Sequence, residues 1–340
     1  MKINQIYMTS FYFSLFLFAL FLLTLFLPKI ARSLKIIDKP DDARKIHSKP
    51  TPALGGLILY SSIIFHFIFD QILIFEYKFS ETFIIIFCST IFFLIGFLDD
   101  QKGLGPIQKT TFIIFTLLII LPLNENFIID VLNFKYFISY PVLLQNASLF
   151  FTIFCIYAFF NAFNFIDGVD GLSISYGIFL LIFISYFSNY TDKLYFTLIL
   201  SLIFCLILNL NKKIFLGNSG ASLFSIILSL LLILNYNKFQ KIYADEILIL
   251  FLIPGIDMIR VIFERLFIKK TKIFMPDNLH FHHLLMRKFP VNLIWMIFIL
   301  ICLLPIIIYL IFSNTFYGLF VGLLIYSLSI VYLKKCKEKK

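Results

Sequence analysis

The sequence predicts an all-α, polytopic integral membrane protein with about eleven transmembrane helices. Of its 340 residues, 61% are hydrophobic and only 14% are charged, and the mean hydropathy is +0.96. No soluble core requires so large a share of apolar side chains. The apolar residues also gather into runs that approach the roughly 20 residues needed to cross a bilayer, with short polar islands between them.

Eleven apolar runs carry this prediction. The first is too long for the apolar core of a signal peptide, and no small-residue cleavage site follows it, so we expect it to remain as a helix. The fourth run is short. The runs cover residues 8–27, 53–69, 82–98, 110–123, 147–163, 172–188, 194–210, 221–236, 244–263, 293–312 and 316–333.

The segment NFIIDVLNFKYFISYP, residues 126–141, predicts a small β-hairpin on the membrane surface. It is apolar but carries Asp130 and Lys135. Its partial alternation of apolar and polar side chains is more typical of strands than of another crossing.

The distribution of basic residues predicts the orientation. With the N-terminus outside, 22 Lys and Arg fall in the inside loops and the C-terminal tail, against 6 in the outside segments. Basic residues favour the cytoplasmic side, so we expect a multi-pass protein of the inner (plasma) membrane whose C-terminus is cytoplasmic. The same bias accounts for the net charge of +10 and gives no reason to invoke nucleic acid.

The polar islands fall at alternate loops, so they share one predicted membrane face. They read KIHSKPTPALGGL, DDQKGLGPIQK, NAFNFIDGVDGL, KKIFLGNSGAS and FMPDNLHFHHLLMRK. The outside loops contain no comparable cluster, so we expect a cytoplasmic site.

In NAFNFIDGVDGL, Asn161, Asn164, Asp167 and Asp170 recur every three residues. On a helix this spacing aligns the side chains along one stripe. Asp-Gly pairs are also ordinary turn and cap residues. That alternative leaves unexplained two Asn within the end of an apolar helix, where polar groups are costly and usually face a cavity.

The adjacent carboxylates Asp99 and Asp100 end another apolar run. Taken alone, they are most simply solvated acids at a helix end. A carboxylate at a helix C-terminus is disfavoured by the helix dipole, and an adjacent pair resists full ionisation without a nearby cation. Mg²⁺, which binds one or two carboxylates together with phosphate oxygens, would suit this pair.

Three of the five histidines, His280, His282 and His283, lie within four residues. A chance cluster in a surface loop is one interpretation. Zinc is another, but no fourth ligand type stands out. The basic residues around the cluster favour an anionic substrate, since imidazolium and guanidinium groups bind phosphate.

In IFLGNSGAS, the backbone of a helix N-terminus could hold a phosphate. Asn218 or Ser219 could equally act as an ordinary N-cap. Acids, amides, a Gly turn and a basic His loop on one face together suit metal-assisted phosphoryl transfer with a lipid substrate.

These motifs resemble the polyprenyl-phosphate N-acetylhexosamine-1-phosphate transferases of glycosyltransferase family 4, in order from about residue 38 to 288. GFLDDQKGLGPIQK resembles the aspartate-pair loop of the family, and NAFNFIDGVDGL its N-x-x-N-x-x-D-G-x-D-G-L signature. PDNLHFHH resembles the H-x-H-H form of the late loop. That form is typical of the branch that acts on UDP-GlcNAc and initiates O-antigen, enterobacterial common antigen or teichoic acid chains.

The resemblance implies one transferase domain over residues 1–340, with its His loop at about 264–292. The implied reaction converts UDP-N-acetylhexosamine and polyprenyl (undecaprenyl) phosphate into polyprenyl-diphospho-sugar and UMP. The implied cofactor is Mg²⁺, with Mn²⁺ as an alternative. A homodimer is one assembly compatible with the family.

The resemblance also implies residue roles. Asp99 and Asp100 would act at the lipid phosphate, and Asp167 would be catalytic beside the nucleotide and metal. Lys49 and Lys109 would bind phosphate. Asn164 and Asn218 would be the metal ligands, and the remaining substrate-binding residues would be Asn161, Asp170, His280, His282 and His283.

Two positions depart from the family pattern. Asn218 stands where the family usually has an Mg²⁺-associated Asp, and Asn278 stands where the His loop often has Arg. An amide oxygen can ligate Mg²⁺ but brings no charge. A catalytically impaired homologue is therefore one alternative. A secondary transporter is another, although transporter sites lie near the bilayer midplane.

Overall fold

The computed structural model describes residues 2–34, 36–38, 50–74, 77–188, 193–272 and 278–335. The chain divides into two compact units, each built from two stretches of sequence. The first comprises Met1–Phe112 and Tyr190–Ile227, and the second Ile113–Asn189 and Leu228–Lys340. The prediction of a single transferase domain stays a prediction.

The first unit contains four helices that lie wholly within it, and α2 packs against both α3 and α7. These helices are α1 (Lys2–Leu34), α2 (Gly55–Phe69), α3 (Phe79–Lys102) and α7 (Lys193–Leu210), with a π-helical turn η1 (Asp70–Ile74) after α2. Two short strands, β1 (Ile37–Asp38) and β2 (Thr51–Pro52), pair antiparallel. Helices α4 (Pro106–Ile120) and α8 (Gly217–Phe239) begin in this unit and end in the other.

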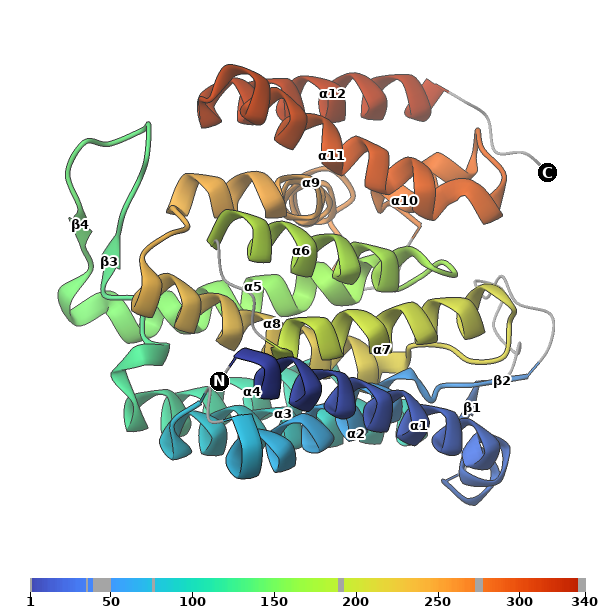
Figure 1. The fold of residues 1–340 in the computed structure, drawn as a ribbon. Helices are drawn as coiled ribbons and strands as arrows, with labels where there is room; N and C mark the ends of the chain where they lie inside the picture. Colours follow the sequence, from blue (N-terminus) through green and yellow to red (C-terminus); the bar gives the residue numbers. More distant parts are fainter. Residues whose placement is uncertain are drawn as a thin grey trace. The chain divides into compact units, whose positions relative to one another are not determined.

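In the second unit, α11 and α12 pack on one another, and α9 packs on α12 and α5. Its helices are α5 (Ser148–Ile166), α6 (Leu172–Ser188), α9 (Ala244–Phe263), the short α10 (Phe281–Met286), α11 (Ile294–Phe312) and α12 (Thr315–Lys335), shown in Figure 1. A second π-helical turn, η5 (Glu264–Ile268), follows α9. Single 3-10 turns lie at η2 (Leu121–Leu123), η3 (Glu125–Phe127), η4 (Gln145–Ala147) and η6 (Val291–Leu293).

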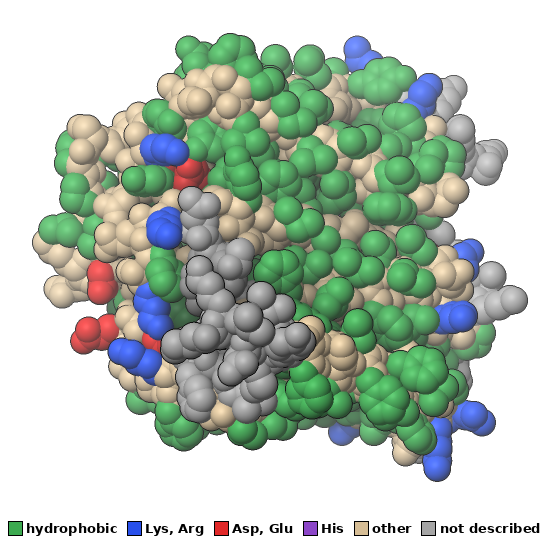
Figure 2. Space-filling model, viewed as in Figure 1, with side chains coloured by type: hydrophobic (Ala, Val, Ile, Leu, Met, Phe, Trp, Pro, Cys, Tyr) green, Lys and Arg blue, Asp and Glu red, His purple; other side chains and the backbone are tan. Residues whose placement is uncertain are grey.

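The fold class predicted from the sequence is confirmed, because most of each of the eleven apolar runs lies in an α-helix. Nine helices in the described part of the chain are long and apolar enough to cross a membrane, two fewer than the predicted eleven. The other two differ for separate reasons. Helix α6 has only 17 residues, and α9 carries four charged residues, Asp245, Glu246, Asp257 and Arg260. On the face drawn in Figure 2, hydrophobic side chains cover much of the surface, and the Lys, Arg, Asp and Glu side chains lie mostly towards its left and right margins.

The predicted hairpin is present in the second unit. Strand β3 (Val131–Leu132) pairs antiparallel with β4 (Val142–Leu143). Lys135, in the loop between them, donates to Glu246 over 3.1 Å and to Tyr309 over 3.0 Å. Partial burial alone would lower the pKa of Lys135, but these two partners raise it overall, so the hairpin is anchored on α9 and α11 by a charged group.

The first unit is tightest where glycines let α2 and α3 meet the start of α8. Gly56 and Gly55 of α2 donate their backbone N–H groups to Leu216 and Phe215 over 3.1 and 3.0 Å. A Cβ on Gly96 of α3 would lie only 2.3 Å from the Asn218 carbonyl oxygen. A Cβ atom at that distance would collide with the backbone, so only glycine at position 96 allows α3 to pack this closely against the start of α8.

We expect Gly96→Ala to lower the free energy of unfolding by about 1–3 kcal/mol, because overpacking forces the backbone apart. Gly255→Ala is the matched control, since a Cβ there meets nothing within 4 Å and alanine favours the helix. Thermal unfolding midpoints in detergent measure both. A Gly96→Ala protein as stable as Gly255→Ala would contradict the packing described here.

Candidate functional site

The first unit holds the aspartate pair at the end of α3. The Asp99 carboxylate accepts from the Lys109 ammonium over 2.5 Å and from the Leu104 backbone N–H over 2.7 Å. Lys109 lies in the first turn of α4. The ion pair between Asp99 and Lys109 therefore joins the end of α3 to the start of α4.

Asp100 caps helix α8. Its two carboxylate oxygens accept from the backbone N–H groups of Asn218 and Ser219, over 2.8 and 2.9 Å. These are amides at the first turn of α8, where four N–H groups have no partner within the helix. The positive end of the helix dipole also favours a carboxylate there. The cap is thus supplied by Asp100 from α3, not by the side chain of Asn218 or Ser219.

Gly217 makes this arrangement fit. Its φ of +78° is a left-handed conformation, and a Cβ would lie 2.9 Å from the Asp100 carboxylate. Two amides of the predicted phosphate-binding turn are thus occupied by a carboxylate of the protein itself. The structure joins Asp99, Asp100, Lys109 and Asn218 in the first unit. Lys49 lies outside the described residues.

The signature NAFNFIDGVDGL spans the end of α5 and the turn before α6. Asn161 and Asn164 donate their side-chain amides to the carbonyls of Tyr157 and Phe160, each over 2.8 Å. Helix α5 ends at Ile166. The prediction that four polar side chains line one face of a helix is therefore right for Asn161 and Asn164. It is wrong for Asp167 and Asp170, because the helix ends before the Asp-Gly pairs.

Asp167 remains fixed beyond the helix end. Its carboxylate accepts from the Ser173 hydroxyl over 2.5 Å. The side-chain oxygen Oδ1 of Asn164 is buried and has no hydrogen-bond partner among the described residues. An unpaired buried acceptor is costly, and this one lies at the negative end of the α5 dipole.

The His loop lies against this turn. A Cβ on Gly168 would be 3.0 Å from His282 Nε2, so Gly168 admits the imidazole. The ring of Phe165 stacks on His280 with centroids 4.7 Å apart, and the Arg265 guanidinium lies 5.9 Å from the same Phe165 ring. Two motifs more than 100 residues apart in the sequence thus meet within one unit.

His280 is held by an acid that the sequence interpretation did not consider. Its Nδ1 lies 3.0 Å from the Asp257 carboxylate of α9. Arg260 pairs with the same carboxylate over 2.6 Å, and the Tyr326 hydroxyl of α12 donates to it over 2.8 Å. The sequence did contain a signal for this acid: Asp257 and Arg260 lie three residues apart in an apolar helix. Charged residues in such a helix are costly and often mark a functional site.

Mg²⁺ would fit the second unit. Among the described residues, no three His, Cys, Asp or Glu side chains lie close enough together to hold a metal, so amide and substrate oxygens would have to complete a site in this unit. The unpaired Oδ1 of Asn164 is such an oxygen, and Asp167 follows three residues later, just beyond the end of α5. Asn218 lies in the first unit, with its backbone amide bonded to Asp100.

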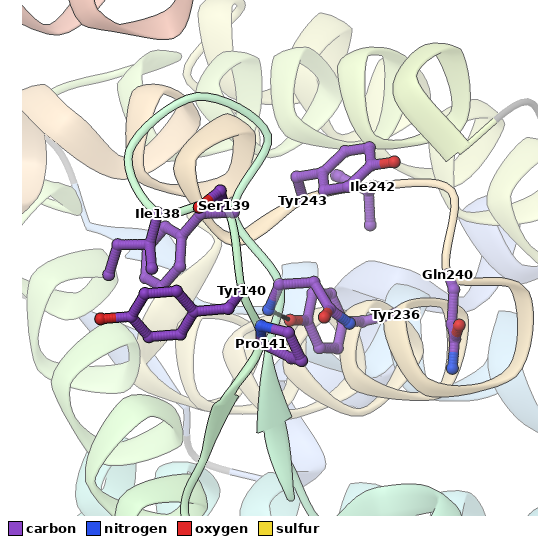
Figure 3. Close-up of a pocket in the computed structure, with 10 residues that line it drawn as sticks. Ile138, Ser139, Tyr140, Pro141, Tyr236, Gln240, Ile242 and Tyr243 are labelled. Atoms are coloured by element: carbon purple, nitrogen blue, oxygen red, sulfur yellow. Dashed lines mark hydrogen bonds between the residues drawn. The ribbon is translucent and has the colours of Figure 1, made fainter.

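A separate pocket of about 260 Å³ lies beneath the hairpin of the second unit. It is lined by Tyr236 of α8, by Tyr243 at the start of α9 and by Tyr140 and Pro141 from the hairpin (Figure 3). The Tyr236 hydroxyl accepts from the Asn133 N–H over 2.7 Å. None of its ten lining residues carries a charge, so this pocket lacks the groups that bind phosphate.

Comparison with known proteins agrees with these motifs. Residues 82–236 match the model of glycosyl transferase family 4. The chain is 29% identical, over 270 residues, to the undecaprenyl-phosphate alpha-N-acetylglucosaminyl 1-phosphate transferase of Escherichia coli K12, covering 76% of this chain and 71% of that protein. It is 28% identical, over 273 residues, to the probable undecaprenyl-phosphate N-acetylglucosaminyl 1-phosphate transferase of Bacillus subtilis, covering 76% and 72%. These findings confirm the family resemblance that the motifs indicated.

His282 should make stability depend on pH. It is only 1% exposed, and burial, together with the neighbouring His283 and His280, holds its pKa well below 6.5. The unfolded chain binds a proton below about pH 6.5 whereas the folded protein does not, so stability should fall as pH drops, by up to about 1.4 kcal/mol per pH unit.

We therefore expect His282→Gln to flatten the fall in the unfolding midpoint between pH 6.5 and 5. Between pH 7 and 8 the two proteins should behave in parallel, which serves as the internal control. An identical acid dependence in both proteins would show that His282 is not buried in its neutral form.

Proposed function

We propose that this protein transfers N-acetylhexosamine-1-phosphate, with GlcNAc-1-phosphate as the expected group, from a UDP-sugar to polyprenyl (undecaprenyl) phosphate. The observation that carries the proposal is the meeting of the Asp167–Gly171 turn with the three-histidine loop in the second unit. The curated relatives act, by their names, on undecaprenyl phosphate. The product would initiate a cell-surface polysaccharide such as O-antigen.

In this reaction, an oxygen of the lipid phosphate attacks the phosphorus that bears the sugar. The bond from that phosphorus to the bridging oxygen breaks, and UMP leaves with that oxygen. Negative charge accumulates between two phosphorylated reactants, so catalysis consists mainly of positioning and charge stabilisation. Mg²⁺, when bound, would supply positive charge at the diphosphate.

The residues divide into two sets in this proposal. Lys109 would bind the lipid phosphate, and Asp99, its partner at 2.5 Å, would accept a proton if the phosphate arrives protonated. Asp100 would hold the first turn of α8 beside them. In the second unit, Asn161 and Asp170 would contact the nucleotide, Asn164 and Asp167 would hold the metal, and His280, His282 and His283 would contact the sugar-diphosphate.

The proposal includes an orientation, with the N-terminus outside and these sets on the cytoplasmic side of the inner membrane. The basic residues of the inside loops support it. A soluble UDP-sugar is made in the cytoplasm, whereas the acceptor is anchored in lipid. A site at the membrane boundary would meet both reactants.

The test is transfer from radiolabelled UDP-GlcNAc to undecaprenyl phosphate by the purified protein with Mg²⁺, followed as labelled lipid and released UMP. We expect Asp167→Asn to lower the rate by about 100-fold or more, because it removes a charge where the transition state needs one. Asp130→Asn, an exposed aspartate of the hairpin, is the matched control. Absence of product with several UDP-sugars would refute the enzyme proposal.

The family resemblance implies Asn218 as the other metal ligand, and Asn218→Asp tests that role. Asn218→Asp adds a carboxylate next to Asp100, whose oxygen lies 2.8 Å from the backbone nitrogen of residue 218. Extra negative charge should lower the Mg²⁺ concentration for half-maximal activity several-fold, since hard cations prefer charged oxygens. A Mg²⁺ titration measures this, and an unchanged requirement would exclude residue 218 from the metal site.

A further inference from the structure

We propose that Asp257 is a positioning residue for the sugar-nucleotide: it fixes the imidazole of His280 through Nδ1 and leaves Nε2 as the ring nitrogen that meets the donor diphosphate. The inference rests on the proposed function, because the diphosphate is the ligand assigned to His280. It adds α9 and α12 to the parts of the chain that shape the site.

Hydrogen bonds hold the edge of the His280 ring. Nδ1 lies 3.0 Å from one Asp257 oxygen. The next residue, Phe281, donates its backbone N–H to both oxygens of the same carboxylate at 3.1 Å. One carboxylate therefore fixes both the side chain of His280 and the backbone that follows it.

The donors around Asp257 determine which ring nitrogen carries the proton. The carboxylate accepts from the Arg260 guanidinium, the Tyr326 hydroxyl and the Phe281 N–H. A carboxylate surrounded by such donors is ionised and can only accept. His280 Nδ1 must then donate, so the ring can take up a second proton only at Nε2, and the protonated Nε2 can donate to a diphosphate oxygen.

Aromatic contacts hold the face of the ring. Phe165 stacks on His280 with ring centroids 4.7 Å apart and an angle of 30° between the rings. The His282 ring lies parallel to the His280 ring, with centroids 6.0 Å apart. With its edge bound by Asp257 and its face packed, the ring has one orientation available. This is the arrangement by which an acid commonly orients a functional histidine.

Asp257 is itself fixed from two helices. It is 3% exposed, and Arg260 also donates to the Leu279 carbonyl over 2.7 Å and to the Tyr326 hydroxyl over 2.7 Å. The residue before His280 and the residue after it are thus both attached to this cluster. A loosened cluster would move the loop that carries His280.

A purely structural role is the competing explanation, and Glu264 separates the two. Glu264 is a buried acid that also pairs with Arg260, over 2.8 Å, and it pairs with Lys334 of α12. It has no bond to His280 among the described contacts. Asp257→Asn and Glu264→Gln therefore make the same chemical change to the same Arg260, but only one changes the partner of His280.

The experiment compares these variants in the UDP-GlcNAc transfer assay, alone and in a His280→Gln background, using protein that elutes as a single peak in detergent. We expect Asp257→Asn to lower kcat/KM for the donor by about tenfold to 100-fold with little change in KM for the lipid. Glu264→Gln should stay within about threefold. In the His280→Gln background, Asp257→Asn should cost at most about twofold, since it acts through His280.

A second readout does not depend on activity. In ¹⁵N-histidine-labelled wild-type protein in nanodiscs, the signals missing from His280→Gln identify His280, which should carry its neutral-state proton on Nδ1 and lose this preference in Asp257→Asn. Three outcomes would each overturn the inference. They are equal falls in kcat/KM for Asp257→Asn and Glu264→Gln, an undiminished fall in kcat/KM when Asp257→Asn is made in the His280→Gln background, and a wild-type His280 whose proton lies on Nε2. An inactive wild type with the Nδ1 proton in place would instead refute the proposed function alone.

Discussion

Burying charge among apolar helices is costly unless each charged group finds a partner inside the protein, and this constraint organises both units. Asp100 is satisfied by the first backbone amides of α8. Asp257 is satisfied by Arg260, Tyr326 and the His280–Phe281 segment. In each case at least one partner of the acid belongs to a polar island of the sequence, so pairing the charge also fixes that segment in place.

The glycines of the polar islands serve the same end. Gly96 and Gly217 allow the Asn218 segment to approach α3 closely enough for Asp100 to reach two amides, and Gly168 admits the His282 ring. A Gly-rich turn is often associated with a bound phosphate. In this protein two of the amides that such a turn would offer are occupied by a carboxylate, so close packing is the first requirement that these glycines meet.

These anchors bear on the proposed reaction. Phosphoryl transfer between a lipid phosphate and a nucleotide depends mainly on holding charged groups still. His280 is held by Asp257 of α9, which in turn is bonded to Tyr326 of α12, and both helices lie outside the matched family segment of residues 82–236. The helices after that segment therefore hold the loop that we propose binds the donor diphosphate.

The sequence by itself determined the helices, the hairpin and the motifs, because hydropathy and local periodicity are properties of neighbouring residues. It also led to the prediction that Asp167 and the histidines are functional, because polar groups among apolar runs are costly unless they have partners or a role. Only the tertiary structure decided that α5 ends at Ile166, that Asp100 caps α8 and that Asp257 holds His280. Each of these depends on partners 20 or more residues away or on the competition between a helix and a turn, and no local pattern specifies which buried acid will reach which donor.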